Sequence, residues 1–281
     1  MKRGTVTILM AFLVFGGRCT PEELELGAGD IVSADDVHPR EGDELRVLSW
    51  NIHGSSQRSD SAHVARVAEE ILTFSPDVVF LQEVHRSTPG SAGADQVEEL
   101  VARTGLSACF SPAIDIGKGS YGTVVLVRGP IESLDVVSLP GSGEPRSLGR
   151  CRVELLGRTV DLYSVHLTAW GRLNRADRAK QIDKLLELVE PGELPVLGGD
   201  FNASRRSPDL VAINSSVRLK SVLEEPLITH PSTRQSFDHI FVDRAWEVLE
   251  AEVPKRGPSD HWPVFAKLRI QEEPVGGTRR D

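Results

Sequence analysis

The sequence predicts an α/β protein in which two packed β-sheets are flanked by helices. Three observations favour this fold class: helical and strand-like apolar patterns alternate early in the chain, strand-like segments crowd its middle, and further strands finish it. The 281 residues, 40% of them hydrophobic, are enough for one large domain with a sizeable core. No low-complexity break interrupts residues 44–270, so we expect one folded domain there.

Strands and amphipathic helices alternate at the start of this domain. Residues 45–50 form a short apolar run, as in a buried strand, and residues 64–72 carry apolar side chains at helical spacing. Residues 78–81 form a second apolar run, typical of a strand buried on both faces. Apolar residues within 94–101 mark a second helix, which we expect to end near Gly105.

The rest of the domain is mostly strand. The run Leu156-Gly157-Arg158 is typical of a hairpin turn between two of these strands. A third helix is expected over residues 179–189. β-Favouring segments predict strands at residues 123–127, 131–139, 151–156, 159–167, 195–199, 237–242, 246–253 and 261–268.

The first 18 residues have the layout of a secretory signal peptide. Lys2 and Arg3 precede a mostly apolar run over residues 5–17, which is shorter than the roughly 20 residues that span a membrane. We therefore expect an exported protein, periplasmic or secreted, with a buried N-terminal helix as the weaker alternative. A lipid anchor at Cys19 is conceivable, but Arg18 directly before it fits such a site poorly.

The remaining terminal segments and the cysteines allow fewer conclusions. Residues 19–43 are acidic and poor in long apolar side chains, so we expect a flexible linker, and residues 271–281 should form a polar tail. Cys109 and Cys151 could form a disulfide in an exported protein or remain buried thiols, and the sequence leaves both open.

The formal net charge of −9 disfavours a generic nucleic-acid binder. Affinity for phosphate backbones comes largely from Lys and Arg side chains that displace counterions. Loss of residues 1–18 would remove three basic and no acidic residues and bring the charge to −12. A local basic cleft could still exist on such a surface.

Six clusters of polar residues interrupt the apolar runs, and each is placed at the downstream end of a predicted strand. Ligand sites in layered α/β folds gather at such ends. The clusters occupy residues 50–54, 81–84, 164–167, 198–203, 237–241 and 259–263.

These clusters contain the groups needed for metal-assisted hydrolysis. Glu83 and Asn51 offer the oxygen ligands that Mg²⁺ prefers, and Asp260 could face the same ion. Asp238 and His261 could form a carboxylate–imidazole pair for proton transfer. Zinc-finger cysteine spacing, a glycine-rich phosphate loop and a serine nucleophile elbow are absent from the sequence.

The six polar clusters, in their order along the chain, resemble the motifs of the endonuclease/exonuclease/phosphatase family, which has the deoxyribonuclease I-like fold. The resemblance runs from about residue 45 to 268, and its most specific motifs are Gly-Asp-Phe-Asn at 199–202 and Ser-Asp-His at 259–261. It implies a four-layer α/β/β/α sandwich with the site at one rim of two mixed sheets. It also implies phosphoester hydrolysis with Mg²⁺, or with Mn²⁺ or Ca²⁺ in its place.

The resemblance also implies roles for individual residues. Glu83 would be the principal metal ligand, supported by Asn51, with Asp260 as a further ligand or positioning group. Asp200 would activate or orient the attacking water, and Asn202 would help hold the water and the phosphate.

The histidines complete the implied site. His261 would contact the phosphate and transfer a proton, with Asp238 as its partner, and His166 would stabilise the developing charge. Tyr121, Arg150 and Trp170 are further candidates for substrate contact. Arg146, Arg150 and Arg152 could together help bind phosphate, but we expect them to be ordinary surface charge on a strand.

Two departures from the family pattern disfavour a DNA nuclease. His53 stands where some nuclease branches have an acidic residue, and residues 121–123 lack the Glu that supports His166 in deoxyribonuclease I relatives. We expect an exported Mg²⁺-dependent phosphoesterase acting on a phosphodiester: a phospholipid head group, a small phosphodiester or nucleic acid. The alternatives are a secreted nuclease on DNA or RNA and a non-catalytic binding module on this fold. No stable protein partner is implied, and we expect a monomer.

Overall fold

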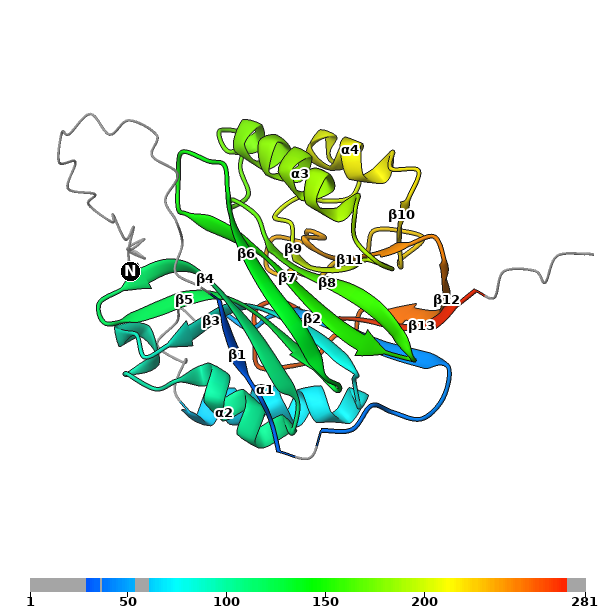
Figure 1. Cartoon of the computed structure of the whole chain (residues 1–281). Coiled ribbons are helices and arrows are strands. Elements are labelled where there is room, and N and C mark those ends of the chain that lie inside the picture. The colour runs from blue at the N-terminus through cyan, green and yellow to red at the C-terminus, as the bar shows by residue number, and fades with distance from the viewer. Residues whose placement is uncertain (1–28, 36, 54–60, 272–281) are drawn as a thin grey trace, which may run out of the picture.

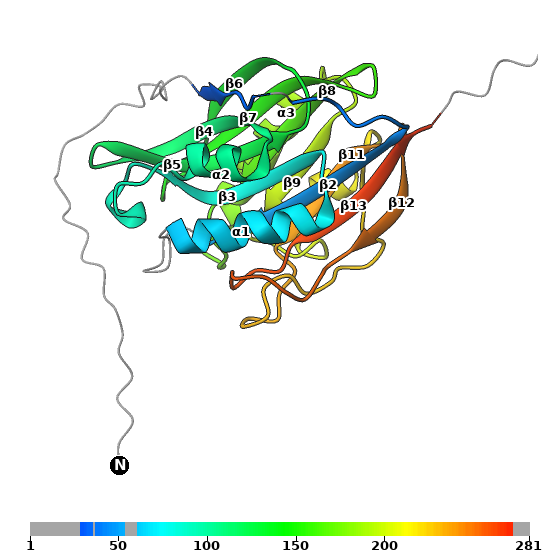
Figure 2. The ribbon, with the colours of Figure 1, turned by 90° about the horizontal axis from the view of Figure 1, so that it is seen from below.

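Two β-sheets lie face to face in the computed structural model, which describes residues 29–35, 37–53 and 61–271 (Figure 1). Helices α1 (Ser61–Phe74) and α2 (Gln96–Thr104) cover the outer face of one sheet. Helices α3 (Arg175–Val189) and α4 (Val211–Asn214) cover the outer face of the other. The predicted α/β/β/α sandwich is therefore confirmed, and Figure 2 shows α1 and α2 against their sheet from below.

Among the described residues the first sheet has seven strands, and its only parallel pair there is β2 with β3, which α1 connects. The other pairs are antiparallel. In spatial order the strands are β1 (Asp30–Val32), β4 (Ser107–Ile116), β5 (Gly119–Val127), β3 (Val78–Arg86), β2 (Glu44–Asn51), β13 (Val264–Ile270) and β12 (Trp246–Glu252).

In the described part of the chain the second sheet has six strands and repeats this plan, because α3 connects its one parallel pair, β8 with β9. The parallel strands of each βαβ unit end at the same edge of their sheet. In spatial order the strands are β10 (Leu219–Ser221), β11 (Asp238–Asp243), β9 (Val196–Asp200), β8 (Arg158–His166), β7 (Arg146–Leu155) and β6 (Ile131–Leu139). Outside the sheets, short 3₁₀ helices lie at Pro89–Ser91 and Pro208–Leu210.

The space between the sheets changes from apolar to polar along the strands. On β8, Val160 and Leu162 belong to the inter-sheet core, and Ser164 and His166 follow on the same face. On β2, Leu45 and Val47 belong to the same core and are followed on the same face by the buried polar residues Ser49 and Asn51. The sheets approach closely here, since a β-carbon on Gly198 would lie 2.1 Å from the ring of Phe80. The polar end of this space is the rim where the predicted clusters meet.

A disulfide joins the two sheets inside the core. Cys109 on β4 and Cys151 on β7 are both fully buried in the inter-sheet cluster, and their α-carbons are 6.3 Å apart. The sequence left free thiols open as an alternative.

Reduction of this disulfide is expected to destabilise the fold by about 4 kcal/mol, because the bond closes a loop 42 residues long in the unfolded chain. Denaturant unfolding of the oxidised and the dithiothreitol-reduced protein measures the difference. A paired Cys109→Ala and Cys151→Ala variant should be insensitive to reductant. Equal unfolding midpoints for oxidised and reduced wild type would contradict the expectation.

The structured region begins before residue 44, which corrects the expected linker over residues 19–43 in its described part, residues 29–35 and 37–43. The rest of that segment lies outside the described residues. Residues 30–32 form β1, which pairs antiparallel with β4. Arg40 Nε donates to Asp77 Oδ1 at 3.0 Å. This segment therefore covers an otherwise unpaired strand edge and supplies a partner for a buried carboxylate.

Several strand boundaries also differ from the sequence expectation. No strand was expected over β4, whose run is interrupted by Pro112 at a shift of register. The last strand begins at Val264 instead of residue 261, so His261 lies in the preceding loop. The expected signal peptide, Cys19 and residues 272–281 of the tail lie outside the described residues. Among the described helices, none is long and apolar enough to cross a membrane.

Candidate active site

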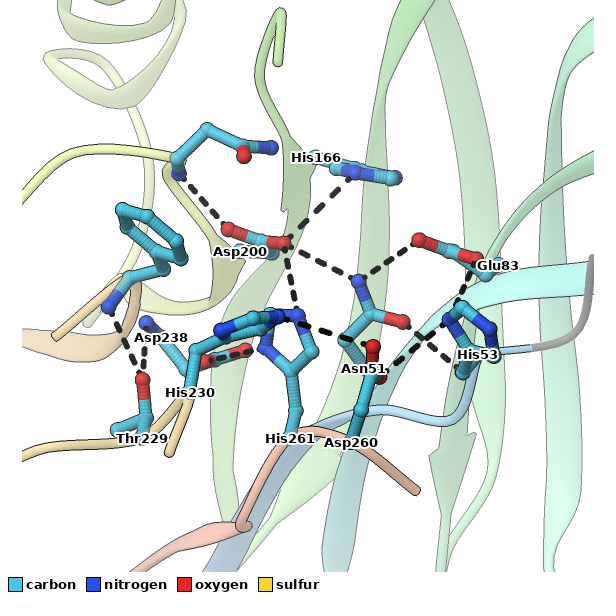
Figure 3. Close-up of polar contacts among 12 residues, drawn as sticks. Asn51, His53, Glu83, His166, Asp200, Thr229, His230, Asp238, Asp260 and His261 are labelled. Carbon is cyan, nitrogen blue, oxygen red and sulfur yellow. Dashed lines mark hydrogen bonds and ion pairs between the residues drawn. The ribbon is translucent and has the colours of Figure 1, made fainter. Parts of the chain in front are cut away.

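The polar clusters meet at one rim of the sandwich, contributed by both sheets (Figure 3). Asn51 ends β2, His166 ends β8 and Asp200 ends β9. The cluster at 81–84 lies inside β3 (Val78–Arg86), at its bulge, and not at the end of the strand. Asp238 begins β11 and the cluster at 259–263 precedes β13, so the expectation that every cluster follows a strand is wrong for three of the six. Both strands run antiparallel to their neighbours, which places their beginnings at the same rim.

Asn51 connects the two sheets. Its Nδ2 donates to Glu83 Oε1 at 3.0 Å and to Asp200 Oδ2 at 3.1 Å. Glu83 lies at a β-bulge in β3 with φ of 63°, a left-handed conformation that is costly for a non-glycine residue. The bulge turns Glu83 toward the rim instead of continuing the regular strand alternation.

Asp238 and His261 form the predicted carboxylate–imidazole pair. His261 Nδ1 is 2.8 Å from Asp238 Oδ2, and both side chains are at least nine-tenths buried. Burial disfavours the imidazolium, but the charge and hydrogen bond of Asp238 prevail and raise the pKa of His261 to about 10. The ring is therefore cationic at neutral pH, and its Nε2 faces the rim.

Asp200 lies at the centre of the rim. Its Oδ1 accepts from the backbone N–H of Asn202 at 2.8 Å, and its Oδ2 lies 3.9 Å from His166 Nε2 and 4.0 Å from His261 Nε2. Burial and the charge of Asp238 raise the pKa of Asp200 to about 6, although His261 opposes the shift. A carboxylate of this basicity can accept a proton from a water near neutral pH.

His166 is neutral. Burial, followed by the positive charges of Arg146 and His261, lowers the pKa of His166 well below its ordinary value. Arg146 Nη1 lies 3.3 Å from His166 Nδ1 and 2.9 Å from Glu144 Oε1. The expectation that Arg146 is surface charge is wrong, because its side chain is 6% exposed beneath the rim. A guanidinium thus stands beside His166 where the family pattern led us to look for a Glu.

Asn202 and two aromatic residues form one wall of the site. Asn202 has φ of 50°, and its amide donates to Leu167 O at 3.1 Å and accepts from Trp170 N at 3.1 Å. Trp170 is 57% exposed and packs against Phe237 with ring centroids 6.0 Å apart. Tyr121 lies in a small pocket with Arg146 and His166, and burial with the nearby Glu83 raises the pKa of its phenol.

Arg150 is not brought to the site. Its guanidinium bonds Asp135 on the neighbouring strand, with Nε at 3.0 Å from Oδ2. Arg152 likewise pairs with Asp161. Alternation along β7 places both side chains on the face opposite the inter-sheet disulfide. Both also lie several residues further along β7 than Arg146, which begins the strand beneath the rim.

Asp260 lies at the outer edge of the rim between two histidines. Its Oδ1 is 3.3 Å from His53 Nδ1, and its Oδ2 is 3.7 Å from His230 Nε2. The same nitrogen of His53 lies 4.0 Å from Glu83 Oε2. His230, which sequence reasoning missed, contacts His261 edge to face with ring centroids 4.6 Å apart. It lies in a polar loop without strand or helix periodicity, so no sequence pattern marked it.

The oxygen donors around Asn51, contributed by both sheets, fit a hard divalent cation. Glu83 and Asp200 present carboxylate oxygens on either side of the Asn51 amide, and Asp260 adds a partly exposed carboxylate. Mg²⁺ favours such oxygen ligands and keeps several waters. Glu83 and Asn51 would hold the ion, with Asp200 or Asp260 within reach.

The proposed cation site lies beside the buried carboxylate of Asp200, the imidazolium of His261 and the neutral imidazole of His166. Together these groups can bind a phosphate and direct a water to it. This site on a four-layer sandwich defines a metal-dependent phosphoester hydrolase. The chain belongs to the endonuclease/exonuclease/phosphatase family, whose model matches residues 48–261.

Curated relatives of the chain include named phosphodiesterases. A 5'-tyrosyl-DNA phosphodiesterase of Caenorhabditis elegans is 29% identical over 84% of this chain and 69% of the relative. Human tyrosyl-DNA phosphodiesterase 2 is 23% identical over 85% of this chain and 72% of the relative. These similarities support a phosphodiesterase of the nuclease type.

Solved structures confirm the fold. An endonuclease/exonuclease/phosphatase from Beutenbergia cavernae superposes with a TM-score of 0.73 at 26% identity, over 84% of this chain and 74% of that one. Danio rerio TDP2 in complex with single-strand DNA product superposes with a TM-score of 0.67 at 20% identity, over 82% of this chain and all of that one.

Proposed function

We propose that this protein is a Mg²⁺-dependent phosphodiesterase that cleaves an ester at the end of a nucleic-acid strand. One observation carries the proposal: Asn51 joins Glu83 to Asp200, and the Asp238–His261 pair faces the same carboxylate. The named relatives support a DNA-derived substrate. A substrate with a terminal ester needs only local contacts, whereas binding of a long duplex depends on many basic side chains that contact its phosphates. The net charge of −9 therefore favours a terminal ester as the substrate.

Each side chain has a place in this reaction. Asp200 orients the attacking water and accepts its proton, and the Asn202 backbone N–H fixes the carboxylate. His261, held by Asp238, donates a hydrogen bond to a non-bridging oxygen, and neutral His166 contacts the phosphate from the second sheet. A bound Mg²⁺ would polarise the phosphate and lower the pKa of water. Charge that develops in the transition state is thus met by prearranged groups.

A substrate panel tests this proposal. The purified protein would be incubated with Mg²⁺ or with EDTA and offered a single-stranded oligonucleotide with a 5'-tyrosyl ester, an unmodified oligonucleotide, plasmid DNA, sphingomyelin and phosphoinositides. We expect EDTA-sensitive release of tyrosine with a 5'-phosphate left on the oligonucleotide. Cleavage of internal DNA linkages at a higher rate would favour the nuclease alternative. EDTA-insensitive or absent turnover on every substrate would favour a binding module.

A phospholipid head group is the second candidate substrate, and one observation favours it. Trp170 and Leu173, which are 57% and 97% exposed, lie on the loop that follows β8 beside the site. Exposed apolar side chains next to a catalytic site can enter a lipid interface. Preferential turnover of sphingomyelin or phosphoinositides in vesicles would decide for this substrate and against nucleic acid.

Export is a separate proposal, supported by the basic and apolar segments within residues 1–17 and by the Cys109–Cys151 disulfide. Expression of the full chain in a bacterial host should yield a shortened N-terminus in the periplasm or medium, as measured by mass spectrometry. An unprocessed chain confined to the cytoplasm would contradict export without affecting the proposed chemistry.

A further inference from the structure

His230, Asp260 and His261 form a cluster that the proposed hydrolysis does not need as a unit. One ligand atom from each lies within 4.8 Å of the others. His230 Nε2 is 3.7 Å from Asp260 Oδ2, and the His230 ring meets the edge of His261 (Figure 3). Two imidazoles with one carboxylate are a donor set that suits zinc and related transition metals, whereas Mg²⁺ prefers oxygen.

The surroundings orient all three ligands. His261 Nδ1 is engaged by Asp238 at 2.8 Å, so Nε2 remains for a metal, and carboxylate-backed imidazoles are usual in zinc sites. His230 Nδ1 lies 2.8 Å from Thr233 Oγ1, which likewise leaves its Nε2. His53 Nδ1 lies 3.3 Å from Asp260 Oδ1 and so leaves Oδ2 directed at His230.

The loop that carries His230 is held against the other two ligands. Thr229 is fully buried, and its Oγ1 accepts from the backbone N–H groups of Phe237 and Asp238 at 3.0 and 3.1 Å. Trp262 N donates to Thr229 O at 2.6 Å. A backbone connection therefore fixes His230 beside residues 260 and 261, and only small movements are needed to reach the spacing of about 3.3 Å between ligand atoms in a tetrahedral zinc site.

We propose that His230, Asp260 and His261 bind one zinc-like transition-metal ion, and that this ion inhibits the enzyme by occupying His261 Nε2. In this arrangement Asp260 serves the zinc-like ion, whereas Glu83, Asn51 and Asp200 remain for Mg²⁺. The two ions use different ligands and can be present together. Metal binding displaces the Nε2 proton of the cationic His261 to the solvent. Occupancy also removes His261 from the phosphate, because a metal-bound nitrogen cannot donate a hydrogen bond. The inhibition rests on the proposed function, whereas the binding does not.

Zinc binding is tested directly, in excess Mg²⁺ and without substrate, by equilibrium dialysis and by the visible spectrum of Co²⁺ as a substitute ion. We expect one Zn²⁺ per wild-type chain and a tetrahedral Co²⁺ spectrum. His230→Phe keeps an aromatic ring against His261 but removes the ligand, and its Zn²⁺ affinity should fall at least about 100-fold, since even an outer partner of a ligand is worth 10–100-fold. The matched control is His38→Phe, because His38 is exposed and distant in sequence from His230; this variant should bind Zn²⁺ with wild-type affinity.

Turnover supplies the second readout. Micromolar Zn²⁺ should inhibit the wild type and His38→Phe in saturating Mg²⁺, whereas His230→Phe should retain its Mg²⁺-dependent rate and resist Zn²⁺. Zinc binding and inhibition that are unchanged in His230→Phe would overturn the site, as would a wild type that binds no Zn²⁺. Zinc bound by His230 without loss of turnover would overturn the inhibition alone. If the wild type binds zinc as expected but turns over no substrate, the proposed function is refuted and the zinc site stands.

Discussion

Asp200→Asn is expected to lower kcat by about 10²–10⁴-fold while the protein stays folded, because the amide cannot accept a proton from the attacking water. The substitution keeps the size of the side chain and its hydrogen bond from the Asn202 backbone N–H. It also removes a carboxylate that burial makes basic, with a pKa of about 6. The measurement is steady-state turnover of the best substrate of the panel in saturating Mg²⁺.

The matched control for this variant is Asp161→Asn. Asp161 is also a buried carboxylate of the second sheet, but it is bonded to Arg152 far from the rim. The Asp161→Asn protein should be less stable than the wild type but should keep the wild-type kcat per folded molecule. A folded Asp200→Asn protein that turns over within tenfold of the wild type would remove Asp200 from the proton-transfer role.

His261→Gln is expected to reduce kcat/KM by about 10²–10⁴-fold, since it removes the cation that contacts the phosphate. Asp238→Asn should reduce it less, because the imidazole remains but loses the charge that raises the pKa of His261 to about 10. The double variant should be hardly slower than His261→Gln alone, because residues that act as a unit are not additive.

A double-mutant cycle on kcat/KM, with circular dichroism to confirm folding, measures this coupling. Additive losses in the cycle would show that Asp238 and His261 act independently, in conflict with their 2.8 Å contact. Losses confined to KM for both variants would assign the pair to substrate binding instead of the chemical step.

The sequence allowed the layers and most of the rim to be predicted, because both depend on local patterns. Apolar runs ended by polar residues marked β2, β3, β8 and β9, and the structure brings together Asn51, Glu83, His166, Asp200, Asn202, Asp238 and His261 within or next to the clusters those runs defined. Strand direction was not encoded in these patterns. For this reason β11 and β13 were expected to end at the rim, where in fact they begin.

Features that depend on tertiary packing escaped prediction. Arg146 carries a charge on a strand-rich segment, and only the buried position at the start of β7 shows that it supports His166. His230 lies 31 positions before His261 in the chain and reaches the site because the adjacent Thr229 is buried and accepts from the backbone N–H of Phe237. Arg150 failed as a candidate for a related reason, since its distance from the rim depends on where β7 begins, and the sequence did not specify that.

The most direct test of the central claim is metal-dependent turnover by the intact rim. EDTA-treated protein would be freed of chelator, offered the 5'-tyrosyl oligonucleotide and titrated with Mg²⁺, in parallel with Glu83→Gln, which lacks the proposed ligand charge. We predict that wild-type turnover appears only with Mg²⁺ and saturates, and that Glu83→Gln requires far more Mg²⁺ or remains inactive. Equal turnover with and without Mg²⁺, or an unchanged Mg²⁺ requirement in a folded Glu83→Gln protein, would contradict the account.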